Sequence, residues 1–252
     1  MSDAEIPDAK GGQVTDLLGI KPIGDAINTI TKTSVEGAVS FLGRICNPAA
    51  DELGQLFADK VRAVRVANTA VIANLAEEKV KKTFGNADVH AHPRLVMEVV
   101  EKGSWIDDDH VRQLWAGLLA SSCSVDVVDD GNLMFTDLLG RITTAQARLF
   151  EHVCRSARKD VDDSGLVGPL EHRMPTEDVL AVMRLADIHR VDRELDYLRT
   201  IGVLGAQGGF RWGANFADVT PSALALQLYV RCQGWPGDPV EFWGLERHPP
   251  MT

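Results

Sequence analysis

Apolar residues recur at helical spacing through most of this 252-residue chain, and short extended segments are confined to its second half. The clearest helical stripe begins behind Asp107, where apolar residues occupy positions i, i+3, i+4, i+7 and i+8 of a single face. This pattern predicts a helix over 108–122 with Trp115 as its core anchor. The five residues of the stripe are Val111, Leu114, Trp115, Leu118 and Leu119.

The longest predicted helix covers residues 47–83. Asn47 is a suitable N-cap, Pro48 suits the first turn, and two acidic residues follow where the helix dipole favours negative charge. Gly85 is expected to end the helix. Such a helix would be about 55 Å long, and we expect a helix over 93–102 and the 108–122 helix to pack against it.

The second half of the chain predicts helices interrupted by short strands. Thr143 and Gln146 form a capping box, the strongest helix start in this half. The order helix, short strand, helix, helix, hairpin, helix is that of a winged helix-turn-helix. The predicted elements are a helix from Thr143, a strand at Gly165–Val167, helices from Thr176 and Asp192, a hairpin turning at Gly208–Gly209, and a helix from Pro221 to Cys232.

We therefore expect a mainly α protein, with a long-helix N-terminal helical domain and a C-terminal winged-helix-like domain that contains a small β-hairpin. The polar, acidic turn at 124–132 is the expected boundary. The tail contains three large aromatic residues, so we expect it to pack onto the body. The predicted divisions are a flexible lead-in at 1–18, the helical domain at 19–131, the winged-helix-like domain at 132–233, and a Pro/aromatic tail at 234–252.

Composition narrows the class of protein. A net charge of -10 argues against nonspecific nucleic-acid binding, because an acidic surface repels phosphate. The four cysteines include no CxxC pair and are expected to be reduced and buried. The first residues lack the charge and apolar pattern of a signal peptide, and no apolar run is long enough for a transmembrane helix. We expect a soluble, cytoplasmic protein that is not integral to a membrane.

Residues with catalytic or metal-binding chemistry are few. His90 and His92, with the run Asp107–His110, are the only cluster that suggests metal ligands, but helix starts explain these residues better. No cysteine has a paired-His pattern, and no GxSxG motif is present. The glycines near 202–209 follow a helix, so they indicate a turn and not a dinucleotide loop. We expect no enzyme activity, catalytic residue, cofactor or metal.

A winged helix suggests DNA binding, but the charge of the predicted recognition helix does not favour it. The candidate nucleic-acid-binding residues are Arg190, Arg193, Arg199 and Arg211. Between residues 189 and 201 three arginines are balanced by three acidic residues, whereas a recognition helix is usually basic. We therefore expect this region to serve protein contacts or packing, and do not expect nucleic-acid binding.

Three stretches together resemble the Abi-alpha (abortive infection alpha) family of bacterial proteins and span about residues 35–233. Gly117 stands where Asn is typical of the family, so no polar role is carried over to that position. The resemblance implies phage exclusion by abortive infection and transfers no catalytic residues. The stretches are Asn47–Gly54 with its continuation through Asp59–Arg62 and Arg65–Asn68, Gln113–Ala120, and Leu195–Leu204 followed by Val219–Pro221.

The leading hypothesis is a non-enzymatic phage-defence protein that acts through protein–protein contacts. The alternatives are a winged-helix DNA-binding regulator, a peripheral membrane effector that uses residues 19–46, and an enzyme of unfamiliar type. Residues 19–46 are mildly amphipathic but contain helix-weakening glycines. We therefore expect this region to gain order by self-association into a homo-oligomer, with a membrane surface as the second choice because its basic residues are few.

Overall fold

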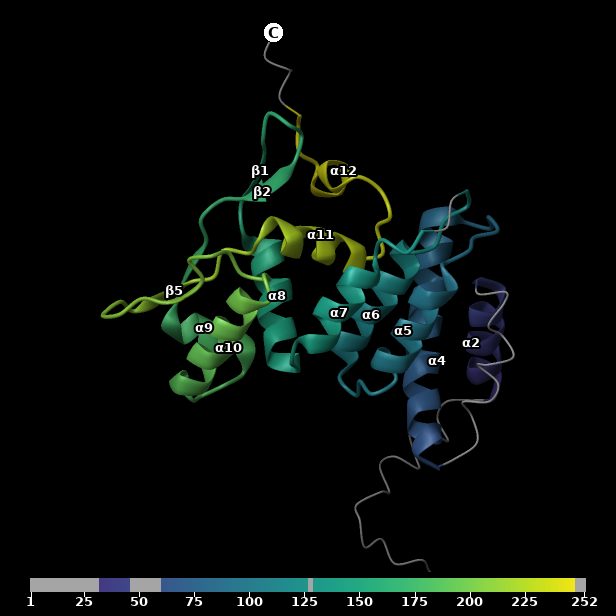
Figure 1. Ribbon diagram of the computed structural model, residues 1–252. Coiled ribbons are helices and arrows are strands. Elements are labelled where there is room, and N and C mark those ends of the chain that lie inside the picture. Colours follow the sequence, from purple (N-terminus) through teal and green to yellow (C-terminus); the bar gives the residue numbers. More distant parts are fainter. Residues whose placement is uncertain (1–31, 46–59, 127–128, 248–252) are drawn as a thin grey trace, which may run out of the picture.

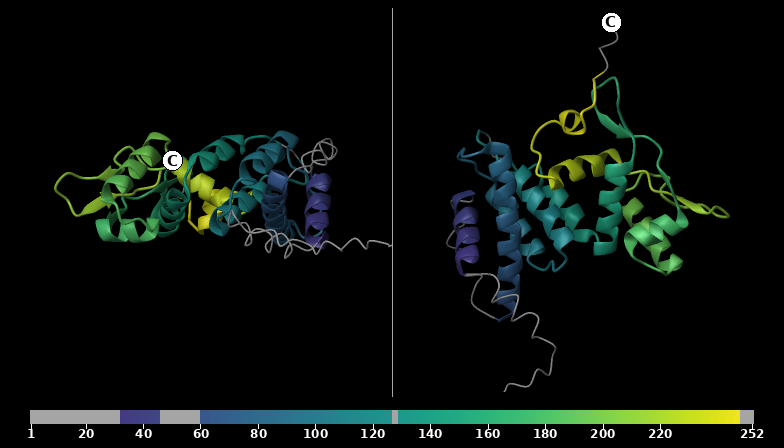
Figure 2. Two further views of the ribbon diagram at one scale, coloured as in Figure 1. Left: turned by 90° about the horizontal axis from the view of Figure 1, so that it is seen from below. Right: turned by 180° about the vertical axis from the view of Figure 1, so that it is seen from behind.

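The computed structural model describes residues 32–45, 60–126 and 129–247, which form a mainly helical, elongated molecule with two small antiparallel sheets (Figures 1 and 2). The helices are α2 (Lys32–Ile45), α4 (Lys60–Phe84), α5 (Pro93–Gly103), α6 (Asp109–Ser121), α7 (Leu133–Arg141), α8 (Thr144–Ser156), α9 (Thr176–Met183), α10 (Ile188–Thr200), α11 (Ala223–Cys232) and α12 (Pro239–Trp243). The strands are β1 (Lys159–Val161), β2 (Val167–Pro169), β3 (Arg173–Pro175), β4 (Gly209–Phe210) and β5 (Phe216–Asp218).

Helix α4 is the long helix of the N-terminal half, and α2 lies along it (Figure 1). The helix ends where the sequence predicts, with Gly85 in the left-handed region at φ 63°. Its predicted beginning at 47–59 lies outside the described residues, as does the lead-in at 1–18. The apolar face of α2 consists of Ala38, Phe41, Leu42 and Ile45, and all four residues are buried inside the protein.

Helices α5 and α6 pack against α4 as expected. The N-cap of α6 is Asp108 and not the predicted Asp107, because the Asp108 carboxylate accepts the backbone N–H groups of His110 and Val111. Trp115 is completely buried, which confirms it as a core residue. Helix α5 runs one residue past the predicted end at 102, and Ser104 is its C-cap.

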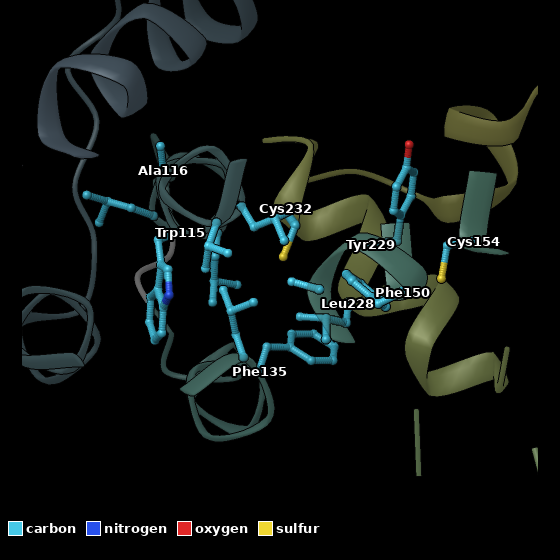
Figure 3. Close-up of a cluster of buried hydrophobic side chains, with 14 of the residues drawn as sticks. Trp115, Ala116, Phe135, Phe150, Cys154, Leu228, Tyr229 and Cys232 are labelled. Atoms are coloured by element: carbon cyan, nitrogen blue, oxygen red, sulfur yellow. The ribbon is translucent and has the colours of Figure 1, made fainter. Parts of the chain in front are cut away.

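Helix α11 returns from the second half of the chain to pack on α6 (Figure 3). The two backbones approach most closely at Gly117, where an added Cβ would lie 1.6 Å from the carbonyl oxygen of Cys232. Only glycine fits at such a crossing, and an Asn side chain would require α11 to sit elsewhere. The buried apolar residues on both sides of the predicted boundary consequently form one continuous core.

Two helix starts in the second half had clear sequence signals, and the structure confirms one of them. The capping box of Thr143 and Gln146 forms at the start of α8. The predicted cap Asp192 is wrong: α10 begins earlier, because Asp187 accepts the backbone N–H of His189 and caps the helix. Asp192 lies exposed on the helix surface.

The extended segments are more numerous than predicted. Strands β1 and β2 form a two-stranded hairpin, and the other sheet has the order β3-β5-β4, antiparallel throughout. The predicted strand at 165–167 is largely a turn, with Gly165 at φ 83° and only Val167 in β2. Strand β3 was not predicted, because three residues are too few for a visible alternation. Helix α11 is capped by Ser222 and begins at Ala223, two residues after the predicted start at Pro221.

The tail folds back over α11 as predicted. The ring of Trp243 stacks on Tyr229 with centroids 5.3 Å apart, and Phe242 meets both rings edge-on. Trp235 in turn lies beside Phe242. The ammonium group of Lys159 lies 4.0 Å from the centroid of the Trp243 ring, which ties the β1 strand to the tail.

The described cysteines are buried and free, as the sequence predicts. Burial raises the pKa of the Cys123 thiol to about 12 and also raises the pKa values of Cys154 and Cys232, so these thiols stay protonated near neutral pH. Cys46 lies outside the described residues. Within the described part of the chain, no helix is both long and apolar enough to cross a membrane.

Candidate functional site

Two arginines of the predicted nucleic-acid set lie on the exposed face of α10, at the end of the molecule opposite to α2 (Figure 1). Arg190 lies 3.6 Å from the carboxylate of Glu194 one turn later, so part of its charge is neutralised. Arg193 makes no ion pair with any described residue. One uncompensated guanidinium is a weak basis for phosphate binding.

The other two predicted arginines serve mainly to fasten the β4–β5 hairpin. Arg199 forms an ion pair of 2.6 Å with Asp196 and donates a hydrogen bond of 2.9 Å to the carbonyl oxygen of Gly208. Arg211 donates to the side-chain oxygen of Gln207 at 3.1 Å. The four arginines thus lie in one region of the molecule, but they do not converge on one shared binding position.

The tip of the β4–β5 hairpin presents Trp212 to solvent. Its exposed area is 105% of the reference for tryptophan, the highest fraction among the exposed large apolar residues of the described chain. A turn closed by the Ala214 N–H and the Arg211 carbonyl oxygen holds it there, with Gly213 at φ 75°. Sequence reasoning missed this residue because it placed the hairpin turn at Gly208–Gly209. That position was wrong: Gly209 lies in β4, and the chain turns after Phe210, before β5 begins at Phe216.

A polar hollow of about 640 Å³ lies between α6, α8 and α9, and is called the junction hollow below. It brings the run Asp107–His110 at the start of α6 beside residues of the second half of the chain. Its lining consists of residues 107–110 at the start of α6, Arg148, Glu151, His152 and Arg155 on α8, and Ala181, Val182 and Arg184 at the end of α9.

One ion pair within the hollow neutralises part of its charge, and a histidine lies against another of its carboxylates. Arg148 contacts the Asp108 carboxylate at 2.9 Å, which joins α8 to the cap of α6. His110 Nε2 lies 2.8 Å from the Glu151 carboxylate, but the two are not aligned for a hydrogen bond, and that nitrogen is buried without a hydrogen-bond partner. These contacts fix the relative position of α6 and α8.

The histidine–aspartate cluster considered as a metal site is divided among separate roles. His90 pairs through its backbone with Ser124, and the His92 side chain accepts the Arg94 backbone N–H at the start of α5. His110 lies instead in the junction hollow. Across the described residues, no group of three or more His, Cys, Asp or Glu side chains is arranged to hold a metal ion.

One serine–histidine contact was not visible in the sequence. Ser156 Oγ lies 3.1 Å from His172 Nε2 at the end of α8, and burial lowers the pKa of His172. The same hydroxyl donates a hydrogen bond of 2.7 Å to the carbonyl oxygen of His152. Because its proton is engaged there, His172 meets an acceptor and not a nucleophile poised to lose a proton.

Comparison with known proteins supplies the biological context that these contacts lack. Residues 67–206 match the abortive infection alpha family, which covers more than half of the chain. The chain belongs to this family. The match includes α5 to α10 and most of α4, and therefore the whole lining of the junction hollow. No curated protein and no solved structure matches the chain.

Proposed function

We propose that this Abi-alpha protein acts in phage defence without catalysis, by binding another protein through its C-terminal half. Family membership supports a defence role of the abortive-infection type. The contact itself is argued from Trp212, because a fully exposed tryptophan on a fixed turn supplies a large apolar area at low entropic cost. We further propose that the protein is cytoplasmic.

The C-terminal half is proposed to be a winged helix used for protein contacts. The sheet order β3-β5-β4, with α9 and α10 between β3 and β4, is the order expected of that fold, and the β4–β5 turn would be its wing. Helix α10 would occupy the position of the recognition helix. Its arginines are largely paired with neighbours, which favours a protein partner over a phosphate backbone.

Replacing Trp212 by Ala tests this proposal with little risk to the fold. We expect Trp212→Ala to weaken partner binding by about 2 kcal/mol or more, close to thirtyfold in affinity, and to reduce protection of cells in a phage plaque assay. Leu166→Ala is the matched control, because Leu166 is 62% exposed at the turn between β1 and β2. Full protection by Trp212→Ala would contradict the proposed contact.

The alternative of a DNA-binding regulator is favoured by the same sheet order, and a gel-shift titration separates the two. We expect no specific duplex binding tighter than about micromolar near physiological salt. Nanomolar, sequence-dependent binding that is lost in Arg193→Ala and Arg199→Ala would favour the regulator.

A further inference from the structure

Trp105, in the turn between α5 and α6, is exposed at the surface although it is a large apolar residue. Its exposed fraction is 61%, and the guanidinium group of Arg65 on α4 lies 4.7 Å from the centroid of its ring. Arg65 Nε also donates a hydrogen bond of 2.9 Å to Ser104 Oγ, which holds the guanidinium group in place. The preceding residue, Val64, is exposed as well. Val64, Arg65 and Trp105 are called the Trp105 patch below.

Helix α2 begins at the end of α4 that carries this patch. Arg44, near the end of α2, lies 3.2 Å from the Glu77 carboxylate on α4. Helix α2 lies alongside α4 and not beyond it, so the two helices run in the same direction (Figures 1 and 2). Lys32 precedes Arg44 by as many residues as Arg65 precedes Glu77, so Lys32 is about level with Arg65. Residues 1–31 therefore join the described chain at the level of the patch.

The start of α2 and the Trp105 patch nevertheless lie on opposite sides of α4. Helices α5 and α6 pack on one side of α4, and α2 packs on the other (Figures 1 and 2). Packed helix axes are about 8–10 Å apart, so a path from α2 around α4 to Trp105 is on the order of 20 Å or more. An extended chain spans at most about 3.5 Å per residue. Residues within about five positions of Lys32 thus cannot reach Trp105 of their own chain.

The sequence before Lys32 complements the patch in apolar spacing and in charge. Three isoleucines follow the spacing i, i+4, i+7, which places them on one face of a helix. They are Ile23, Ile27 and Ile30. Residues 1–31 contain five acidic and two basic side chains, a net charge of -3. The first six residues of α4, Lys60–Arg65, contain three basic and no acidic residues. Opposite charges at these two places favour their association.

We propose that the Trp105 patch of one copy of this chain binds residues 20–31 of a second copy. The isoleucine face packs on Trp105 and Val64, and the acidic segment lies against Arg65, which makes no ion pair with any described residue. Ile27 and Ile30 lie within five residues of Lys32, so a second copy has to supply them. Two copies related by a twofold axis exchange both segments. This gives the expected self-association a binding surface, at the end of the molecule opposite to Trp212.

The first test is light scattering of the full chain over a range of concentrations. Trp105→Ala and Ile27→Asp should each weaken association about thirtyfold or more, the usual effect of losing an interface anchor. Arg65→Gln should weaken association at low salt and much less at high salt, because its contribution is electrostatic. Leu166→Ala is the matched control, since Leu166 is equally exposed in the other half of the chain, and it should associate like the parent. Melting temperatures show that each variant is folded.

Mixing the two variants provides the decisive test. The Trp105→Ala chain keeps an intact segment and the Ile27→Asp chain keeps an intact patch, so together they form one of the two contacts. We expect the mixture to associate more tightly than either variant alone. A monomeric parent, dissociation by Ile27→Asp but not by Trp105→Ala, or a mixture no tighter than its components would overturn the proposal. None of these outcomes depends on Trp212 or on the plaque assay.

Discussion

At the scale of single residues, the tightest backbone approach among the described glycines is at Gly117, where there is no room for a side chain. Helix α6 is otherwise filled with large apolar residues, and the crossing with α11 exists because position 117 has no Cβ. The sequence marked Gly117 as a departure from the residue typical of the family. The structure gives the departure a physical meaning, since the backbone at Cys232 occupies the space that a side chain would need.

Gly117→Ala should therefore destabilise the protein. The added methyl group would meet backbone, which cannot rotate away, so α11 must shift and the core on both sides must repack. We expect a loss of about 2–3 kcal/mol in the free energy of unfolding, measured by urea denaturation.

Gly37→Ala is the matched control for this measurement. Gly37 is exposed within α2, and an added Cβ there would meet nothing within 4 Å. We expect Gly37→Ala to stabilise by roughly 0.5–1 kcal/mol through helix propensity. A Gly117→Ala protein as stable as the parent would show that α11 does not cross α6 as described.

At the scale of elements, side-chain caps decide where helices begin. The start of α8 was predictable because its capping box is a local four-residue pattern. The start of α10 was misplaced because two aspartates, Asp187 and Asp192, both precede apolar residues at helical spacing. Asp187, the first of the two, caps the helix, because Val191 is then buried together with Leu195 and Leu198.

The two aspartates should respond differently to removal of their carboxylates. Asp187→Ala leaves the first turn of α10 without its acceptor and should cost about 1 kcal/mol. Asp192→Ala changes an exposed position within the helix and should lie within about 0.5 kcal/mol of the parent. Thermal unfolding of both variants provides the comparison. A larger loss of stability in Asp192→Ala than in Asp187→Ala would show that the helix is capped by Asp192, and would contradict Asp187 as its cap.

At the scale of the whole molecule, α11 joins the two halves. It leaves the β5 strand, crosses the molecule and packs on α6, α8 and β2, and the aromatic tail covers it (Figure 1). A cut at the predicted boundary of 124–132 would separate α11 from α6 and open a continuous apolar core. We therefore expect the two halves to unfold together in one cooperative transition.

Self-association through the N-terminal region remains a prediction, and the structure sharpens its test. Because α2 buries its apolar residues against α4, removal of residues 1–46 would expose core and cause association of its own. A chain that begins at residue 32 avoids this artefact. We expect the full chain to be oligomeric by light scattering and the shortened chain to be monomeric. The same state for both chains would contradict an interface in residues 1–31.

The sequence by itself determined the helical class, the positions of most described helices, the buried Trp115 and the family. These features depend on periodicity and on caps formed within a few residues, which the chain carries locally. Tertiary structure alone decided the crossing at Gly117, the pairing of β3 with β5 and the assembly of the junction hollow. Each of these depends on residues far apart in the chain, and their contacts follow from how the helices pack.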